Sequence, residues 1–342
     1  MDANITKNRL GNMLSYDWVK ILITAVAAIV FWALIFTMTA TRITAAQQFT
    51  VFNYTGNLSF SATDFYDVYS KAFRDGDFSD EVLEIDEFDL PTMAEVASTQ
   101  LEAQTSVGAG DLIFAADVPN LSSAAYKDPV TGEDAHYHYL EELLRVYRYK
   151  MFHLDPNNEE SFFKLMEKYL NPYFGGNYAT GTLDKGLAEK DFRARIARNK
   201  DKRYKKEEQI KVGLASEYER LEKYRDALVE FYGYLDKGYI SITPTTIRDT
   251  KNPAKIEGYG CYSINLCPET DNSGAENPMK KLSSTLAYQT TYVDEQGVEK
   301  PVKSAVNMHV CFFRLEGVEA GYEYEGLLFV NSLIRHTLSQ VA

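Results

Sequence analysis

The chain of 342 residues is long enough for one large domain or for two domains of ordinary size. Its hydrophobic fraction of 45% can build a core, which excludes a wholly disordered protein. The formal net charge of −13 argues against nucleic acid as the main partner, because binding to phosphates needs a positive surface.

A long apolar segment lies near the N-terminus. Residues Ile21 to Ala40 include no charged side chain, and a helix of that length crosses about 30 Å of hydrocarbon. Basic residues precede the segment at Lys7, Arg9 and Lys20. The positive-inside rule therefore predicts a cytoplasmic segment (residues 1–20), a transmembrane helix (residues 21–41) and an extracytoplasmic remainder, which describes a single-pass protein of the cell membrane. A cleaved signal peptide is the alternative, although its apolar region is usually only about 7–15 residues long.

A strand–helix–strand unit is predicted after this anchor. Spaced aromatic residues first predict a helix over residues 60–73. A partly alternating strand follows over residues 82–90, and a helix over residues 92–105 ends at the turn Gly108-Ala109-Gly110-Asp111. The continuous apolar run of residues 112–116 is typical of a buried parallel strand. Together these elements predict a right-handed crossover within a parallel sheet.

The middle of the chain has a helical pattern. Helices are predicted over residues 137–152 and 159–169. Leucines recur every seven residues at Leu214, Leu221, Leu228 and Leu235, which predicts one long amphipathic helix or a short coiled hairpin. The basic stretch of residues 193–206 is expected to be a solvated helix face, with binding to anionic lipid headgroups as an alternative.

The pattern changes to strands after residue 239. Strands are expected over residues 239–242, 259–264 and 305–313. Residues 285–293 and 298–302 predict a hairpin around Asp294–Gly297. A helix over residues 323–338 is expected to close the chain.

This pattern resembles the extracellular solute-binding proteins of bacterial ABC importers, of the large two-lobed kind (type II periplasmic-binding-protein-like), in a membrane-anchored variant. The resemblance lies in the strand–helix unit, the Gly-Ala-Gly-Asp turn and the apolar strand that ends at Asp117. The later segments YGCYSINLC, AVNMHVCFF and EGLLFVNSLIRH also contribute, so that the likeness covers about half of the chain and is architectural.

The resemblance implies an α/β fold class, in which the N-terminal transmembrane helix is followed by a two-lobed domain with a largely helical second lobe. The α/β lobe would comprise residues 50–130 plus 239–342, and the helical lobe residues 131–238. The implied function is capture of a small solute, such as a carbohydrate, between the two lobes, with an ABC permease as the partner. A surface scaffold or sensor that kept the fold without ligand transport is the alternative.

Candidate ligand-binding residues follow from the expected topology. Ligands of open α/β sheets bind beyond the carboxyl ends of the strands, which selects Asp117 and Asn120. Tyr173, Asn177 and Tyr178, in the glycine-rich break, are the candidates for the opposite wall of the cleft. We expect the 24 tyrosines mainly to line helix faces, although stacking on sugars is the alternative.

The sequence offers no catalytic motif, so we expect neither an enzyme nor a cofactor. His136 and His138 would share a face of a strand and could bind a metal, but they stand at an expected helix start, so no metal site is predicted. Cys261, Cys267 and Cys311 lie in the exported part, where one disulfide is possible. Three buried free thiols are the equal alternative.

Overall fold

The computed structural model describes residues 7–39, 47–54, 76–79, 82, 84–91, 94–199, 201–293, 299–314 and 322–341. It divides the chain into two units, Met1–Thr44 and Ala45–Ala342, and each is described by itself. The helix expected over residues 60–73, the first two residues of the helix expected over residues 92–105 and the turn Asp294–Gly297 lie outside the described residues.

The N-terminal unit contains one long helix, α1 (Lys7–Thr39). Its segment Trp18–Ile35 has a mean hydropathy of 2.3 and is not buried within the structure. Large side chains such as Phe31 and Trp32 are exposed over 63% and 70% of their surface. By length and composition, this helix could be a membrane anchor or a signal sequence.

The second unit is built on a five-stranded sheet in the order β2-β1-β3-β11-β8. The strands are β1 (Gln48–Tyr54), β2 (Glu84–Asp89), β3 (Leu112–Ala116), β8 (Ile264–Asn265) and β11 (Met308–Phe312). β1 runs parallel to β2 and to β3, whereas β11 is antiparallel to β3 and to β8. The mixed α/β class is therefore confirmed.

The predicted strand–helix–strand unit is present as β2, α3 (Ala94–Ser106) and β3. Gly108 and Gly110 follow α3 with φ angles of 85° and 135°, which a side chain bearing Cβ rarely adopts. β1 (residues 48–54) is not among the predicted strands. In the structure β1 lies between β2 and β3, and its residues from Phe49 onward are buried.

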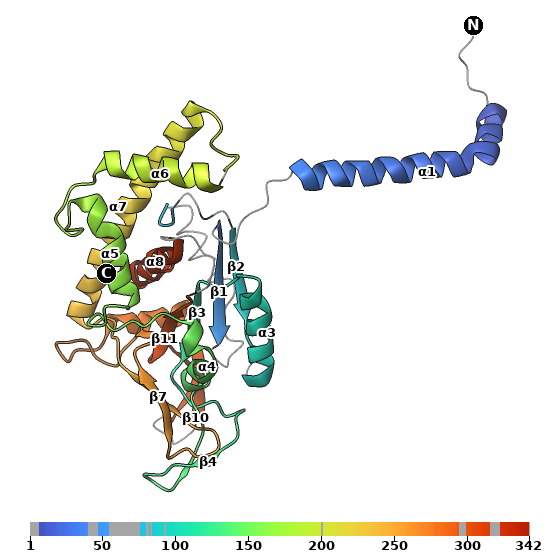
Figure 1. Cartoon of the computed structure of the whole chain (residues 1–342). Coiled ribbons are helices and arrows are strands. Elements are labelled where there is room, and N and C mark those ends of the chain that lie inside the picture. The colour runs from blue at the N-terminus through green and yellow to red at the C-terminus, as the bar shows by residue number, and fades with distance from the viewer. Residues whose placement is uncertain are drawn as a thin grey trace. The chain divides into compact units, whose positions relative to one another are not determined.

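Helices cover both faces of the sheet. Successive side chains of β3 point to opposite faces, so this strand contributes to two hydrophobic clusters. Leu112, Phe114 and Ala116 pack in one hydrophobic cluster with residues of α5 (Phe162–Leu170), α7 (Glu207–Lys237) and α8 (Glu325–Ser339). Ile113 and Ala115 pack in a second cluster with α3 and α4 (Tyr139–Tyr147). Figure 1 shows α3 on one side of β1, with α5, α7 and α8 on the other.

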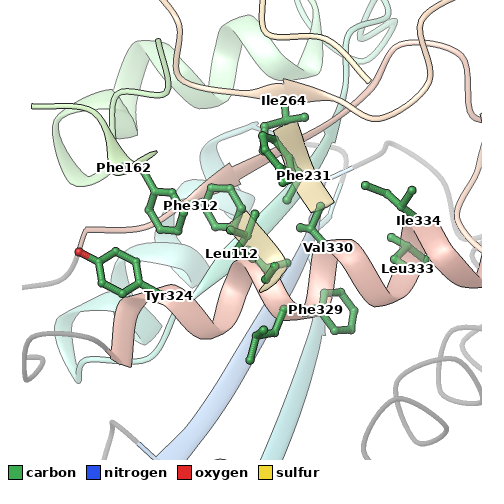
Figure 2. Packing of buried hydrophobic residues seen from close by; sticks show 14 of the residues in the cluster. Leu112, Phe162, Phe231, Ile264, Phe312, Tyr324, Phe329, Val330, Leu333 and Ile334 are labelled. Atoms are coloured by element: carbon green, nitrogen blue, oxygen red, sulfur yellow. The ribbon is translucent and has the colours of Figure 1, made fainter. Parts of the chain in front are cut away.

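The helices of the middle segment share a core with the sheet. The ring of Phe162 in α5 stacks on that of Phe312 in β11, with centroids 4.6 Å apart, and Figure 2 shows the two rings side by side. Phe163 stacks in turn on Phe231 of α7 at 4.8 Å. A two-lobe arrangement, with residues 131–238 as the second lobe, is not shown: within the unit Ala45–Ala342, helices of this segment share a hydrophobic core with the sheet.

Other predicted elements differ from the structure in part: the strand expected over residues 239–242 is only an isolated bridge between Ser241 and Asn265, and the strand expected over residues 259–264 is divided between two short strands. The long amphipathic helix is α7, which has 31 residues and ends at Gly238 with a φ of 71°. The predicted hairpin is present as β9 (Tyr288–Val293) and β10 (Glu299–Ser304), paired antiparallel. The remaining elements are α6 (Lys185–Asn199), β4 (Tyr126–Lys127), β5 (Asp134–Ala135), β6 (Thr245–Arg248), β7 (Ile256–Gly260), η2 (Arg148–Lys150), η3 (Asn171–Phe174), η4 (Pro278–Ser284) and η5 (Tyr322–Tyr324).

A buried ion pair joins α6 to α7. Arg220 is 1% exposed and donates to both oxygens of Glu217, at 2.7 Å from Nη2 and 3.1 Å from Nε. Arg195 of α6 donates to the same carboxylate at 2.7 Å and 3.2 Å. Arg193 pairs with Glu189 and with Glu207. The positive charge of the basic stretch, residues 193–206, is thus partly neutralised by carboxylates of the fold.

Candidate functional site

A cleft of about 620 Å³ lies at the carboxyl end of β3. Two small hairpins contribute residues to its wall, β4–β5 and β6–β7, together with the residues that lead into α4. In Figure 1 the arrowhead of β1, which is parallel to β3, points toward the end of the sheet where β4 and β7 lie. The acidic and basic side chains that line the cleft are Asp117, Asp128, Asp134, His136, His138, Glu141, Arg248 and His309, and the phenol of Tyr126 lines it too.

Asp117 and His138 form a close polar pair in the cleft. The Nδ1 atom of His138 lies 2.7 Å from Oδ1 of Asp117, and both side chains are partly exposed. Partial burial by itself raises the pKa of Asp117, but the hydrogen bond from His138 and the imidazoles of His309 and His138 bring that pKa below its ordinary value. Asp117 is therefore a carboxylate at neutral pH, and its hydrogen bond fixes the orientation of the His138 ring.

The fold places these two residues together by pairing distant backbone segments. Asp117 follows the last residue of β3, and its amide donates to the carbonyl of Asn307 at 2.9 Å. His138 is the N-cap residue of α4 and has an extended backbone. A β-bridge between Pro119 and His138 aligns the two segments.

His309 forms the floor of the cleft from β11. It is 3% exposed, and its Nδ1 lies 2.8 Å from Oγ of Ser263. Burial lowers the pKa of His309 from 6.5 to about 4, although Asp117 opposes the change. The imidazole of His309 is consequently neutral at pH 7, and it does not balance the charge of Asp117.

Glu141 and Arg248 form a second ion pair in the cleft. Glu141 is 4% exposed and accepts from the backbone amide of Arg248 at 2.7 Å and from its Nη1 at 3.2 Å. Arg145 contacts the same carboxylate at 3.4 Å and donates from Nε to the carbonyl of Arg248 at 3.0 Å. This network attaches the β6–β7 hairpin to α4, so that the wall of the cleft is fixed in place.

Aromatic residues support the opposite hairpin. Tyr126 of β4 lines the cleft and stacks on Tyr137, with ring centroids 4.6 Å apart. The guanidinium of Arg145 lies 4.3 Å from the centroid of the Tyr137 ring. Lys127 pairs with Asp134 at 2.9 Å across β4 and β5. These contacts hold the small β4–β5 hairpin against α4.

Of the two residues predicted beyond β3, only Asp117 lines the cleft. Asn120 is fully buried, and its Nδ2 donates to Oε2 of Glu142 at 2.7 Å. Its Oδ1 accepts from the amide of Ser122 at 3.0 Å, which stabilises the turn after β3. Asn120 has a structural role here and does not reach the cleft.

The other three predicted residues lie away from this cleft. Tyr173 is in η3, and its hydroxyl donates to Asp191 of α6 at 3.1 Å. Asn177 accepts from the amides of Ala179 and Thr180, and the amide of Tyr178 donates to Asn171 at 2.9 Å. These residues are not among those that line the cleft, because the glycine-rich break packs beside α6 and α7.

All three cysteines are buried free thiols in the structure, which is the second of the two alternatives. Cys261 precedes β8, Cys267 follows it, and Cys311 is in β11. Cys311 pairs with Ile113 of β3 in the sheet and packs on the face that α3 and α4 cover. Cys267 belongs to the cluster on the opposite face, so the sheet separates these two thiols.

Sequence reasoning missed His309, Glu141 and Arg248 as residues of the cleft. They come from β11, α4 and β6, and the pairing of these segments is visible only in the fold. His136 and His138 were considered only as metal ligands. Within the part of the chain that the structure describes, no three His, Cys, Asp or Glu side chains are placed to hold a metal ion.

A comparison of this chain with protein families, with curated proteins and with solved structures finds no match.

Proposed function

We propose that residues 45–342 form an extracytoplasmic domain that binds a small polar solute and that α1 tethers to the membrane. The observation that carries the proposal is the 620 Å³ cleft at the carboxyl edge of the sheet. Its volume falls in the range of about 300–1,000 Å³ that small-molecule sites occupy. Its position beyond β3 is where open α/β sheets bind ligands.

The orientation of the chain is part of the proposal. The basic residues before the apolar part of α1, among them Lys7 and Lys20, favour a cytoplasmic N-terminus. Fusions of a reporter that is active only outside the cytoplasm, placed after residue 342, would be active in this orientation. If the reporter were active only when fused to the N-terminus, the orientation would be the opposite one.

Binding without catalysis is the function that the cleft favours. Asp117 and His138 could act as an acid–base pair, but acyl transfer also needs an accessible nucleophile. Ser263, which contacts His309, is fully buried. We therefore propose a receptor for a solute, and delivery to an ABC permease is the role that the resemblance suggests.

The resemblance implies two lobes that close on the solute, with residues 131–238 as the second lobe. The contact between Phe162 and Phe312 favours a different arrangement, in which the β4–β5 and β6–β7 hairpins form the wall opposite the sheet. The same contact favours a second candidate function, a surface scaffold or sensor without a transported ligand, because hinge closure needs separate lobes.

A thermal-shift screen of residues 45–342 distinguishes the two candidates. Sugars, amino acids, amines, small carboxylates and peptides would be tested at saturating concentration. A ligand at a hundred times its Kd adds about 2.7 kcal/mol of stability, which raises Tm by several degrees. A shift with one class supports the receptor. No shift with any class, in a protein that melts cooperatively, supports the scaffold.

A further inference from the structure

We infer that the solute of this cleft carries a protonated amine, so that the ligand is a small organic ammonium compound. The inference rests on the proposed binding function and names its ligand class. It is based on three features of the lining: the acceptors that the histidines present, the sign of the charge, and the buried imidazole at the floor.

Two histidines of the cleft each direct Nδ1 to a protein acceptor, which leaves Nε2 as the other ring nitrogen. The Nδ1 atom of His138 faces Asp117 Oδ1 at 2.7 Å, and that of His136 faces the carbonyl oxygen of Ser123 at 3.0 Å. A carboxylate and a carbonyl oxygen only accept, so each Nδ1 must carry the proton. In the neutral imidazole the other nitrogen, Nε2, is then an acceptor.

The third histidine adds a buried polar group at the floor. His309 is 3% exposed and lines the cleft, and its Nδ1 is occupied by Ser263 at 2.8 Å. Because His309 lines the cleft, a ligand bound there would contact this neutral imidazole.

The fixed charges of the lining are mainly negative. Four carboxylates line the cleft and only one arginine does, and that arginine is paired with Glu141 at 3.2 Å. Asp134 is balanced by Lys127. Within the described part of the chain, neither Asp117 nor Asp128 has a lysine or arginine at ion-pair distance. The net charge of the lining side chains is therefore negative, which favours a cationic ligand.

An ammonium group matches both the acceptors and the negative charge of the lining. It has three donors and a positive charge, whereas a carboxylate or phosphate would meet acceptors and like charge. A neutral polyol has the donors without the charge. A metal ion is disfavoured, since no three suitable ligand side chains converge among the described residues.

Isothermal titration of the full-length chain in detergent tests the ligand class with four probes. These are 1,4-diaminobutane, tetramethylammonium, mannitol and succinate. We expect the diamine to bind, tetramethylammonium to bind at least about tenfold more weakly because it has no N–H donor, and succinate not to bind.

The variant Asp117→Asn removes the charge and keeps an oxygen that accepts from His138. It should weaken diamine binding by about tenfold or more. The matched control is Asp226→Asn on α7, where the aspartate is exposed and pairs with Arg225, and it should bind as the wild type does.

The outcomes separate this inference from the proposed function. Binding of mannitol or succinate without the diamine overturns the ligand class and leaves a solute-binding function in place. Diamine binding that Asp117→Asn does not weaken overturns the assigned site. If none of the probes binds and the broad thermal-shift screen is also negative, both the ligand class and the proposed function are overturned.

Discussion

The ring of Phe162 lies parallel to that of Phe312, with centroids 4.6 Å apart and an interplanar angle of 7°. This contact joins the helical middle of the chain to the sheet (Figure 2). Both side chains are at most 1% exposed. Because they belong to one core, the helices and the sheet should unfold together.

Replacing Phe162 by alanine should destabilise the whole domain. Loss of a fully buried phenylalanine costs about 3–5 kcal/mol, since it removes apolar burial and leaves a cavity. Urea unfolding followed by far-ultraviolet circular dichroism and by tyrosine fluorescence measures the effect. The control Tyr149→Ala, at a position that is 70% exposed, should change stability by less than about 0.5 kcal/mol. Two separate transitions in the wild type would show that the helices form an independent lobe.

The buried ion pair between α6 and α7 predicts a large cost for removing one charge. In Glu217→Gln, Arg220 and Arg195 lose their shared carboxylate, and an uncompensated buried charge typically costs about 3–5 kcal/mol. The matched control is Glu219→Gln on the same helix, whose carboxylate is 59% exposed, and it should cost at most about 1 kcal/mol. Equal unfolding midpoints for the two variants in urea would contradict the structure.

His309 predicts a specific pH dependence of stability. Its pKa is about 4 in the folded chain and 6.5 in the ordinary state, so between these values only the unfolded chain binds the proton. The free energy of unfolding should therefore rise from pH 4 to pH 6.5, by up to about 3 kcal/mol from this group. Asp117, whose folded pKa is lowered, acts in the same direction at lower pH.

The variant His309→Gln should flatten this rise, as measured by the unfolding midpoint in urea at each pH. The control His153→Gln, outside the cleft, should retain the slope of the wild type because it retains His309. An unchanged slope in His309→Gln would mean that the imidazole is not buried as described.

The cysteines predict slow modification of the native protein. Cys267 and Cys311 are fully buried and Cys261 is 9% exposed. Burial raises the pKa of Cys267 to about 12 and raises that of the other two thiols as well. A maleimide should label none of them quickly in native buffer. In denaturant without reductant it should add three labels by mass spectrometry, whereas a single label would reveal a disulfide.

The sequence predicted those parts of the fold whose signal is local. The apolar run of β3, the glycines after α3 and the leucine spacing of α7 each identify an element without reference to the rest of the chain. β1 was missed because its polar residues Thr50 and Asn53 are buried, each 3% exposed or less, within the sheet. Burial of such residues is decided by neighbouring strands, which the sequence does not identify.

Only one residue of the candidate site, Asp117, was predicted from the sequence. Asp117 follows a buried strand, and the general position of ligands in α/β sheets was enough to select it. Asn120 lies three residues later, where the turn directs it to Glu142. The opposite wall depends on pairing of β6 with β7 and of β11 with β3, which are long-range contacts without a signal in local spacing.

The position of the bound solute is tested most directly by the histidines, because the chain has five and three of them line the cleft. Two-dimensional NMR of residues 45–342 with ¹⁵N-labelled imidazoles would follow all five side chains as a solute that binds is added. We predict shifts of His136, His138 and His309, with His153 and His336 unchanged. Saturable binding that shifts only His153 or His336, or none of the five, would contradict a binding site at the edge of the sheet.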